Sequence, residues 1–174
     1  MSSQEKNSLA PSCEFTENLD LLRQTYFFSG LPLESLKVFA YLCTRETFRS
    51  GDYLFRQDED DGQAFYLVSG RLCVERTEKG KTRELRTFEA GQFIGGLTLL
   101  GETRRLYSLR AAADAVCIVL GREKFAKAIQ QFPDQMPRIF KAVVKVVDDW
   151  EERFLTERAD DCGGCLPNLG VSLL

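Results

Sequence analysis

A pair of glycines followed nine residues later by an arginine is the spacing in this chain that most clearly suggests a binding site. Glycines let a backbone approach an anion closely, and the N–H groups of a turn or of a helix start point toward it. A guanidinium adds a two-pronged, charge-assisted clamp. These residue types together predict a site for a phosphate group. Its candidate residues are Gly95, Gly96, Leu97, Thr98, Arg105 and Leu106.

The same residues also have an interpretation without a binding site. A glycine-rich turn between two strands, followed by an exposed pair of arginines, would use Gly95, Gly96, Arg104 and Arg105 without binding anything. The wider context favours a site, because glycines and apolar residues recur in a regular order on both sides of the run. That context extends from about residue 28 to residue 155.

The run at residues 91–111 resembles the phosphate-binding cassette of the cyclic-nucleotide-binding domain, the sensor module of catabolite-activator regulators and of cyclic-nucleotide-dependent kinases and channels. In that family an arginine nine residues after a glutamate grips the cyclic phosphate, and Arg105 stands at the arginine position. Ser50-Gly51-Asp52, residues 65–70 and Gly91 resemble the family's other glycine landmarks. The resemblance implies a mainly β fold: a β-roll or jelly roll with flanking helices and a long C-terminal dimerisation helix.

Two positions depart from the family pattern. Gly96 replaces the glutamate that accepts the ribose 2′-hydroxyl, and Leu106 replaces a small residue beside the phosphate. Losing a hydrogen bond to a charged group costs about 1.5 to 3 kcal/mol, so the resemblance implies weak binding of cyclic AMP or cyclic GMP. By the same reasoning, Gly96→Glu is expected to strengthen binding, while Leu106 is expected to narrow the pocket.

Composition excludes several classes of function. The 174 residues suit one domain with a substantial core. A net charge of −3 disfavours a nucleic-acid surface. The absence of histidine excludes Ser-His and Cys-His nucleophilic machinery and a cupin-like metal site, so we expect neither an enzyme nor a bound metal.

No run approaches the ~18 apolar residues of a membrane span, and no signal peptide is apparent. A cytoplasmic protein that needs no cofactor is therefore expected.

The six cysteines divide into a scattered group and a close pair. A chain of this size folds without disulfides, so the scattered thiols are expected to be reduced and mostly buried. Cys162 and Cys165 form a lone CxxC motif, which supplies only two of four zinc ligands. We expect this pair to lie in an inert tail, with a redox role as the alternative. The scattered cysteines are Cys13, Cys43, Cys73 and Cys117.

Short β-rich runs punctuated by glycine occupy the middle of the chain. Many short strands at roughly even spacing predict a sandwich, barrel or jelly roll. Between two of them, the acidic run 58–61 lacks the alternating oxygen ligands of a calcium loop, so a solvated loop is expected. Helices are predicted at 14–26, 33–42 and 122–131. The expected strands are residues 45–48, 53–56, 64–68, 72–77, 84–88, 106–111 and 116–120.

A longer helix follows Pro133, and one face of it carries an apolar seam. Spacings of four and three residues separate its members, as in a two-stranded coiled coil. In the family this helix carries the dimer interface and borders the pocket, so the resemblance implies a homodimer with two-fold symmetry. The alternative is that the seam packs on the chain's own barrel. The seam consists of Met136, Phe140, Val143, Val147, Trp150 and Phe154.

These elements divide the chain into a flexible lead (1–13), a cyclic-nucleotide-binding-like domain with N-terminal helices (14–131), a long dimerisation helix (132–158) and a flexible tail (159–174). The tail is too short for the helix-turn-helix that the family's transcription factors place here, so direct DNA binding is not expected. Three functions stay open: a stand-alone regulatory sensor of a small phosphate-bearing ligand, a ligand-free interaction protein with a protein partner, and a redox-responsive regulator.

Overall fold

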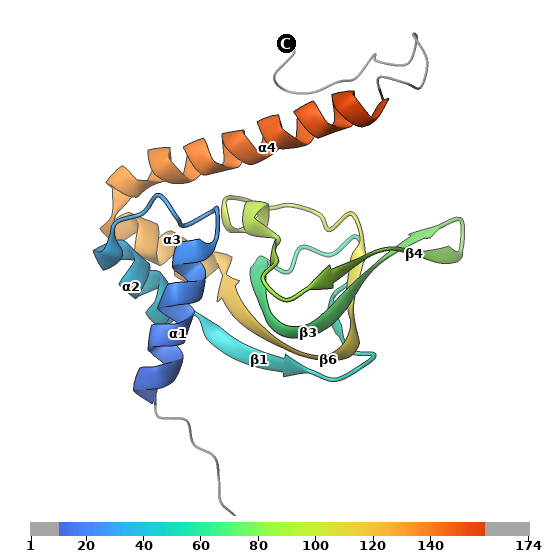
Figure 1. Cartoon of the computed structure of the whole chain (residues 1–174), viewed down its shortest axis with the longest axis horizontal. Helices are drawn as coiled ribbons and strands as arrows, with labels where there is room; N and C mark the ends of the chain where they lie inside the picture. The colour runs from blue at the N-terminus through green and yellow to red at the C-terminus, as the bar shows by residue number, and fades with distance from the viewer. Residues whose placement is uncertain (1–10, 159–174) are drawn as a thin grey trace, which may run out of the picture.

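A computed structural model describes residues 11–158, with side-chain contacts described between residues 14 and 153 (Figure 1). Two helices open this part of the chain, α1 (Pro11–Gln24) and α2 (Leu33–Leu42), and they pack against each other. Helix α1 begins three residues before the predicted helix, because proline lacks an N–H and suits a first helical turn. The predicted flexible lead is therefore too long at its C-terminal end.

Within residues 11–158, six antiparallel strands form one sheet. They are β1 (Thr44–Phe48), β2 (Tyr53–Phe55), β3 (Gln63–Glu78), β4 (Lys81–Glu89), β5 (Phe93–Ile94) and β6 (Ser108–Gly121). The order is β1-β6-β3-β4, with β2 paired to β6 and β5 paired to β3. Long, bent β3 and β6 curl the sheet into a roll with helices at one end (Figure 1). The predicted β-roll with flanking helices is confirmed.

Two breaks between expected strands fall inside long strands instead. Gly70 was expected to end one strand, yet β3 continues through it while its pairing with β6 shifts register. Its φ of +92° and the approach of β6 explain why glycine stands here: a Cβ would lie 2.2 Å from the Asp114 carbonyl oxygen. The runs 106–111 and 116–120 likewise belong to one strand, β6, which begins at Ser108.

The core consists of two apolar clusters. One lies between the helices and the roll, where the rings of Phe27, Phe28, Phe39 and Phe125 are in contact and each is at most 3% exposed. The other fills the roll around Phe65. Burying a side chain of this size stabilises the fold by about 1.5 to 3 kcal/mol. The first cluster therefore fixes the helices at the end of the roll.

The C-terminal helices follow β6 directly. They are α3 (Arg122–Gln131), the short 3₁₀ helix η2 (Pro133–Gln135) and α4 (Met136–Arg158), which crosses over the roll in Figure 1. The break at residues 132–135 makes α4 shorter than the predicted helix 132–158. None of the helices within 11–158 combines the length and apolar character that a bilayer span requires.

The predicted seam on α4 divides into a buried and an exposed part. Met136 and Val143 pack against the core together with Ile139, which is fully buried and was absent from the predicted seam. Phe140 and Trp150 are 52% and 53% exposed. Part of the face thus packs on the chain's own core, and dimerisation through the exposed part stays a prediction. The side chain of Phe154 and the pair Cys162 and Cys165 lie outside the described residues.

Candidate functional site

The glycine pair starts a single helical turn at the mouth of the roll. Gly95 has φ +81° and precedes the 3₁₀ helix η1 (Gly96–Leu99). A Cβ at Gly95 would lie 2.5 Å from Nη1 of Arg105 and 3.0 Å from the Gln63 carbonyl oxygen. Only glycine therefore combines this backbone conformation with so close an approach of the arginine. The N–H groups at the start of η1 have no partner within the helix, as at any helix start.

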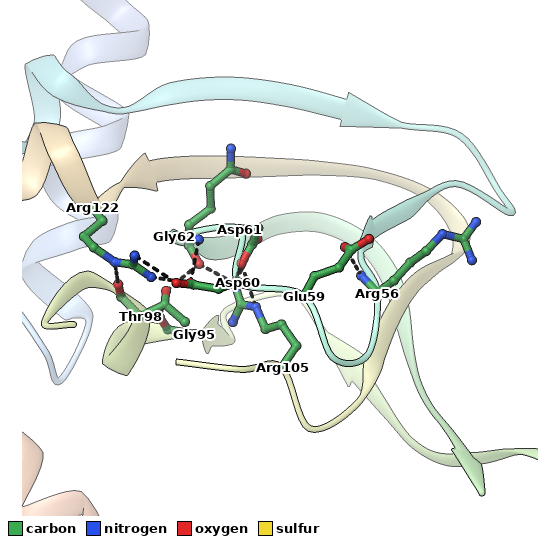
Figure 2. A network of polar contacts seen from close by, with 10 residues as sticks. Arg56, Glu59, Asp60, Asp61, Gly62, Gly95, Thr98, Arg105 and Arg122 are labelled. Atoms are coloured by element: carbon green, nitrogen blue, oxygen red, sulfur yellow. Dashed lines mark hydrogen bonds and ion pairs between the residues drawn. The ribbon is translucent and has the colours of Figure 1, made fainter. Parts of the chain in front are cut away.

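Arg105 is buried, and most of its hydrogen-bonding capacity is used inside the protein (Figure 2). Its Nε and Nη2 donate to the two Asp61 carboxylate oxygens at 2.8 and 3.0 Å, and Nη2 also donates to the Gln63 carbonyl oxygen at 2.5 Å. The guanidinium carbon lies 3.8 Å from the centre of the Phe55 ring. Since a buried guanidinium requires a counter-charge, Asp61 supplies it.

One nitrogen of Arg105 remains available to a ligand. Among the described residues no acceptor is found for Nη1, the nitrogen that lies beside Gly95. An anion resting on the start of η1 would therefore meet Nη1 without displacing Asp61. Both the glycine turn and the arginine would then contact the same group.

The acidic loop is more than a solvated turn. Arg122 pairs with Asp60 and donates through Nε to the Thr98 carbonyl oxygen at 2.6 Å, which ties the loop to η1 (Figure 2). The hydrogen bond from Arg122 lowers the pKa of Asp60 below its usual value. Asp58 pairs with Arg104 at 3.2 Å between two exposed side chains. The prediction of a solvated loop was therefore incomplete, because three of its carboxylates bind arginines.

A pocket of about 470 Å³ lies beside this cassette. All six candidate residues line it, together with Tyr26, Phe27 and Val143, Val146 and Val147 of α4. Leu106 is 61% exposed, so it stands at the rim and leaves the interior open. Burial raises the pKa of both Tyr26 and Tyr107, another lining residue, so these phenols stay protonated at neutral pH.

Two threonines in the lining differ in their hydrogen bonding. The Thr98 hydroxyl lies 2.7 Å from the Gly95 carbonyl oxygen and 2.9 Å from that of Gln63, so it serves the turn itself. The Thr103 hydroxyl oxygen is buried, and no hydrogen-bond partner is found for it in the described part of the chain. A bound ligand could satisfy Thr103 without disturbing Thr98.

Gly96 is closely surrounded by aromatic rings. A Cβ added there would lie 2.8 Å from the Phe93 ring and 3.1 Å from the Phe27 ring. The room that a glutamate side chain needs is therefore filled. The expectation that Gly96→Glu alone strengthens binding meets a steric obstacle that the sequence did not reveal.

A group of possible metal ligands on the sheet is occupied by an arginine. Cys73, Glu75 and Glu84 place their ligand atoms within 4.8 Å of one another. Arg110 donates to Glu75 at 2.6 Å and to Glu84 at 3.1 Å, and the Tyr53 hydroxyl donates to Glu75 at 2.9 Å. The carboxylates thus form an ion-pair network centred on Arg110, and a metal would have to displace it.

The sequence profile of the family described as cyclic nucleotide-binding domain matches residues 45–132. The match includes the glycine turn, Arg105 and the strands that hold them. The chain belongs to this family.

Relatives with this domain include kinases and regulators. The cGMP-dependent protein kinase egl-4 of Caenorhabditis elegans is 31% identical over 152 residues, covering 78% of this chain and 19% of the kinase. The chain thus spans about a fifth of the length of this relative.

Solved structures share the fold at lower identity. The N-terminal domain of a transcriptional regulator from Streptomyces coelicolor has a TM-score of 0.68 at 18% identity, covering 77% of this chain and 94% of that one. A regulatory subunit of a cAMP-independent protein kinase A from Trypanosoma cruzi, bound to guanosine, has a TM-score of 0.65 at 18% identity. The match covers 86% of this chain and 51% of that one.

Proposed function

We propose that this chain is a regulatory sensor module that binds a small phosphate-bearing ligand, a cyclic nucleotide held weakly, and signals through α4. One observation carries the proposal: a single pocket is lined both by the cassette and by Val143, Val146 and Val147 of α4. A ligand there would contact the anion-binding turn and the helix at once. No further cofactor is required, and the module itself performs no chemistry.

The phosphate would rest on the start of η1 beside Nη1 of Arg105. Its charge would meet the arginine and the N–H groups of the turn. The ribose would lack the carboxylate that Gly96 replaces, which weakens binding about tenfold to a hundredfold. The base would lie against Tyr26 and Val147. We therefore expect cyclic AMP and cyclic GMP to bind in the high micromolar range or weaker.

Signalling requires that the ligand favour one arrangement of α4 over another, because a ligand with equal affinity for both would shift nothing. The exposed face of α4, with Phe140, Val144 and Trp150, is the proposed homodimer surface. Movement of α4 would then be transmitted to a second copy or to another protein partner. Direct DNA binding and membrane binding form no part of the proposal.

A second candidate is an interaction protein that keeps the fold without a ligand. The observations that favour it are the two hydrogen bonds that Arg105 donates to Asp61 and the rings that fill the space at Gly96. A redox role for Cys162 and Cys165 has no support among the described residues. The free thiols of Cys43, Cys73 and Cys117 fit the reducing cytoplasm that we propose as the location.

The test uses Trp150, the single tryptophan of the chain, which lies on α4. Titration with cyclic AMP, cyclic GMP and guanosine should change its fluorescence saturably if the ligand acts on the helix. Calorimetry of the same titrations reports binding independently. Binding without a fluorescence change would refute signalling through this part of α4, and absence of binding at millimolar ligand would favour the interaction protein.

A further inference from the structure

The hairpin of β3 and β4 carries a charge opposite to that of the rest of the molecule. Residues 76–86 contain five basic and two acidic side chains, a net charge of +3, whereas the whole chain carries −3. The hairpin projects from the roll on the side away from α1, α2 and α3 (Figure 1). At its base this basic segment contacts the residue that precedes the acidic loop: the Thr77 N–H donates to Oε1 of Gln57 at 2.9 Å.

Like charges face each other across the hairpin. Arg76 lies directly opposite Arg83 in the register of β3 and β4, an arrangement that destabilises a sheet. Glu75 and Glu84 also lie opposite each other, but Arg110 binds both carboxylates. The acidic pair is thus neutralised by one shared arginine, whereas in the basic pair only Arg76 has a carboxylate partner among the described residues, Glu78.

The basic side chains surround a hollow of about 590 Å³. Arg76 pairs with Glu78 at 2.8 Å, but for Lys79, Lys81 and Arg83 no ion-pair partner is found among the described residues. Leu85, at 57% exposed, adds an apolar surface in their midst. The hollow is lined by Arg76, Glu78, Lys79, Lys81, Arg83 and Leu85.

Strand β4 also offers an open edge. Within residues 11–158 it pairs with β3 alone, and every residue from Lys81 to Thr87 is exposed. An open edge presents backbone N–H and C=O groups in the pattern that an added strand requires. Lysines and arginines on such a strand discourage pairing with cationic or neutral strands but attract an acidic one.

We propose that the β3–β4 hairpin is a docking surface for an acidic, extended protein segment, which adds to the edge of β4 and places carboxylates in the hollow beside Arg83. A protein strand fits better than a polyanion, because only a strand uses both the backbone edge and the apolar surface of Leu85. The remainder of the chain, with a net charge of −6, would repel a long nucleic acid. This surface is distinct from the proposed ligand pocket, so its test is independent of that proposal.

The probe is a fluorescent peptide of alternating Glu and Val as long as β4, nine residues. Two N-methylated isomers, one modified at the odd and one at the even positions, carry the same charge but block opposite edges of the peptide. Fluorescence anisotropy is measured for the native chain, for Arg83→Glu and for Lys127→Glu, a control with the same change in charge on the exposed face of α3. Duplex DNA and phosphatidylserine vesicles are tested as competitors, and sedimentation gives the oligomeric state of each variant.

Saturable binding is expected, weakened about tenfold or more by Arg83→Glu and less than about twofold by Lys127→Glu, with an affinity ratio of about ten between the two isomers. The melting temperature of Arg83→Glu should be unchanged or raised, because the substitution removes a like-charge pair. Lys81→Ala should also weaken binding.

Absence of binding, equal effects of the two glutamate variants, or equal binding of the isomers would overturn the proposal. Tighter binding to DNA or to vesicles would also overturn it. So would self-association of the native chain that is lost in Arg83→Glu, because a second copy of the chain would then be the occupant.

Discussion

Two arginines, Arg105 of the cassette and Arg83 of the β3–β4 hairpin, have opposite surroundings. Arg105, 5% exposed, donates two hydrogen bonds to Asp61 and lies over Phe55. Arg83 is exposed, faces Arg76 across the hairpin, and has no carboxylate within ion-pair distance among the described residues. A buried cation must be paired with a counter-charge, whereas an exposed one remains solvated without a partner.

The difference predicts different affinities at the two sites. A phosphate at Arg105 would share a guanidinium that is already neutralised, so its gain in binding is small. An acidic group at Arg83 would meet uncompensated positive charge, but in water and with screening by salt. We therefore expect weak binding in the pocket beside the cassette and salt-dependent attraction over the surface of the hairpin.

The largest expected effect is that of Arg105→Ala. Removing Arg105 leaves the Asp61 carboxylate, only 17% exposed, without its partner and should cost about 3 kcal/mol of unfolding free energy. Arg104→Ala is the matched control: its pair with Asp58 is exposed and should contribute at most about 1 kcal/mol. Urea titration of both variants measures the difference. Equal losses would contradict the distinction between the buried and the exposed arginine.

The next largest effect is expected at Gly96, where aromatic rings fill the space beside the backbone. Gly96→Glu should destabilise the fold by about 1 to 3 kcal/mol, because its side chain meets the rings of Phe27 and Phe93. Phe93→Leu removes the nearest ring atom, so the double variant should recover part of that stability and bind cyclic AMP about tenfold more tightly than Phe93→Leu alone. Thermal unfolding measures the stability of each variant, and calorimetry measures its affinity for cyclic AMP. Tighter binding by Gly96→Glu alone, with no loss of stability, would show that the rings move aside without cost.

Across the hairpin, Arg83→Glu should raise stability slightly. It turns the Arg76–Arg83 repulsion into an opposite-charge pair, worth about 0.2 to 1 kcal/mol. Lys127→Glu on α3 should show no such gain. Chemical denaturation at low and at high salt is the measurement, since screening should reduce the gain. A destabilised Arg83→Glu would mean that the arginine serves the fold rather than a partner.

Acid should release the loop beside the cassette. The hydrogen bond from Arg122 lowers the pKa of Asp60 below its ordinary value of 3.8, so the pair stabilises the folded state above that value. This stability is lost as the pH falls through the folded-state pKa. The difference in melting temperature between the native chain and Asp60→Asn should therefore be present at neutral pH and disappear in acid. A difference independent of pH would assign the stabilisation to contacts other than the charge of Asp60.

The sequence predicted the roll and the helices, because glycine spacing and apolar periodicity are local signals, whereas the ligand contacts of the cassette stay a prediction. It missed Asp61, since a pairing of loop 58–61 with Arg105 depends on how distant segments meet. Four carboxyls in a short loop and two adjacent arginines downstream were the available signal. The rings around Gly96 and the position of Ile139 could not be predicted either, because both follow from tertiary contacts that no spacing encodes.

We propose that the pocket recognises a phosphate through Arg105 and the turn at Gly95. Calorimetric titration of the native chain with cyclic AMP and with adenosine tests it most directly, because the two ligands share the base and differ chiefly in the phosphate. We predict that cyclic AMP binds in the high micromolar range and about tenfold or more tightly than adenosine. Equal affinities for the two ligands, or no heat from either at millimolar concentration, would contradict the claim.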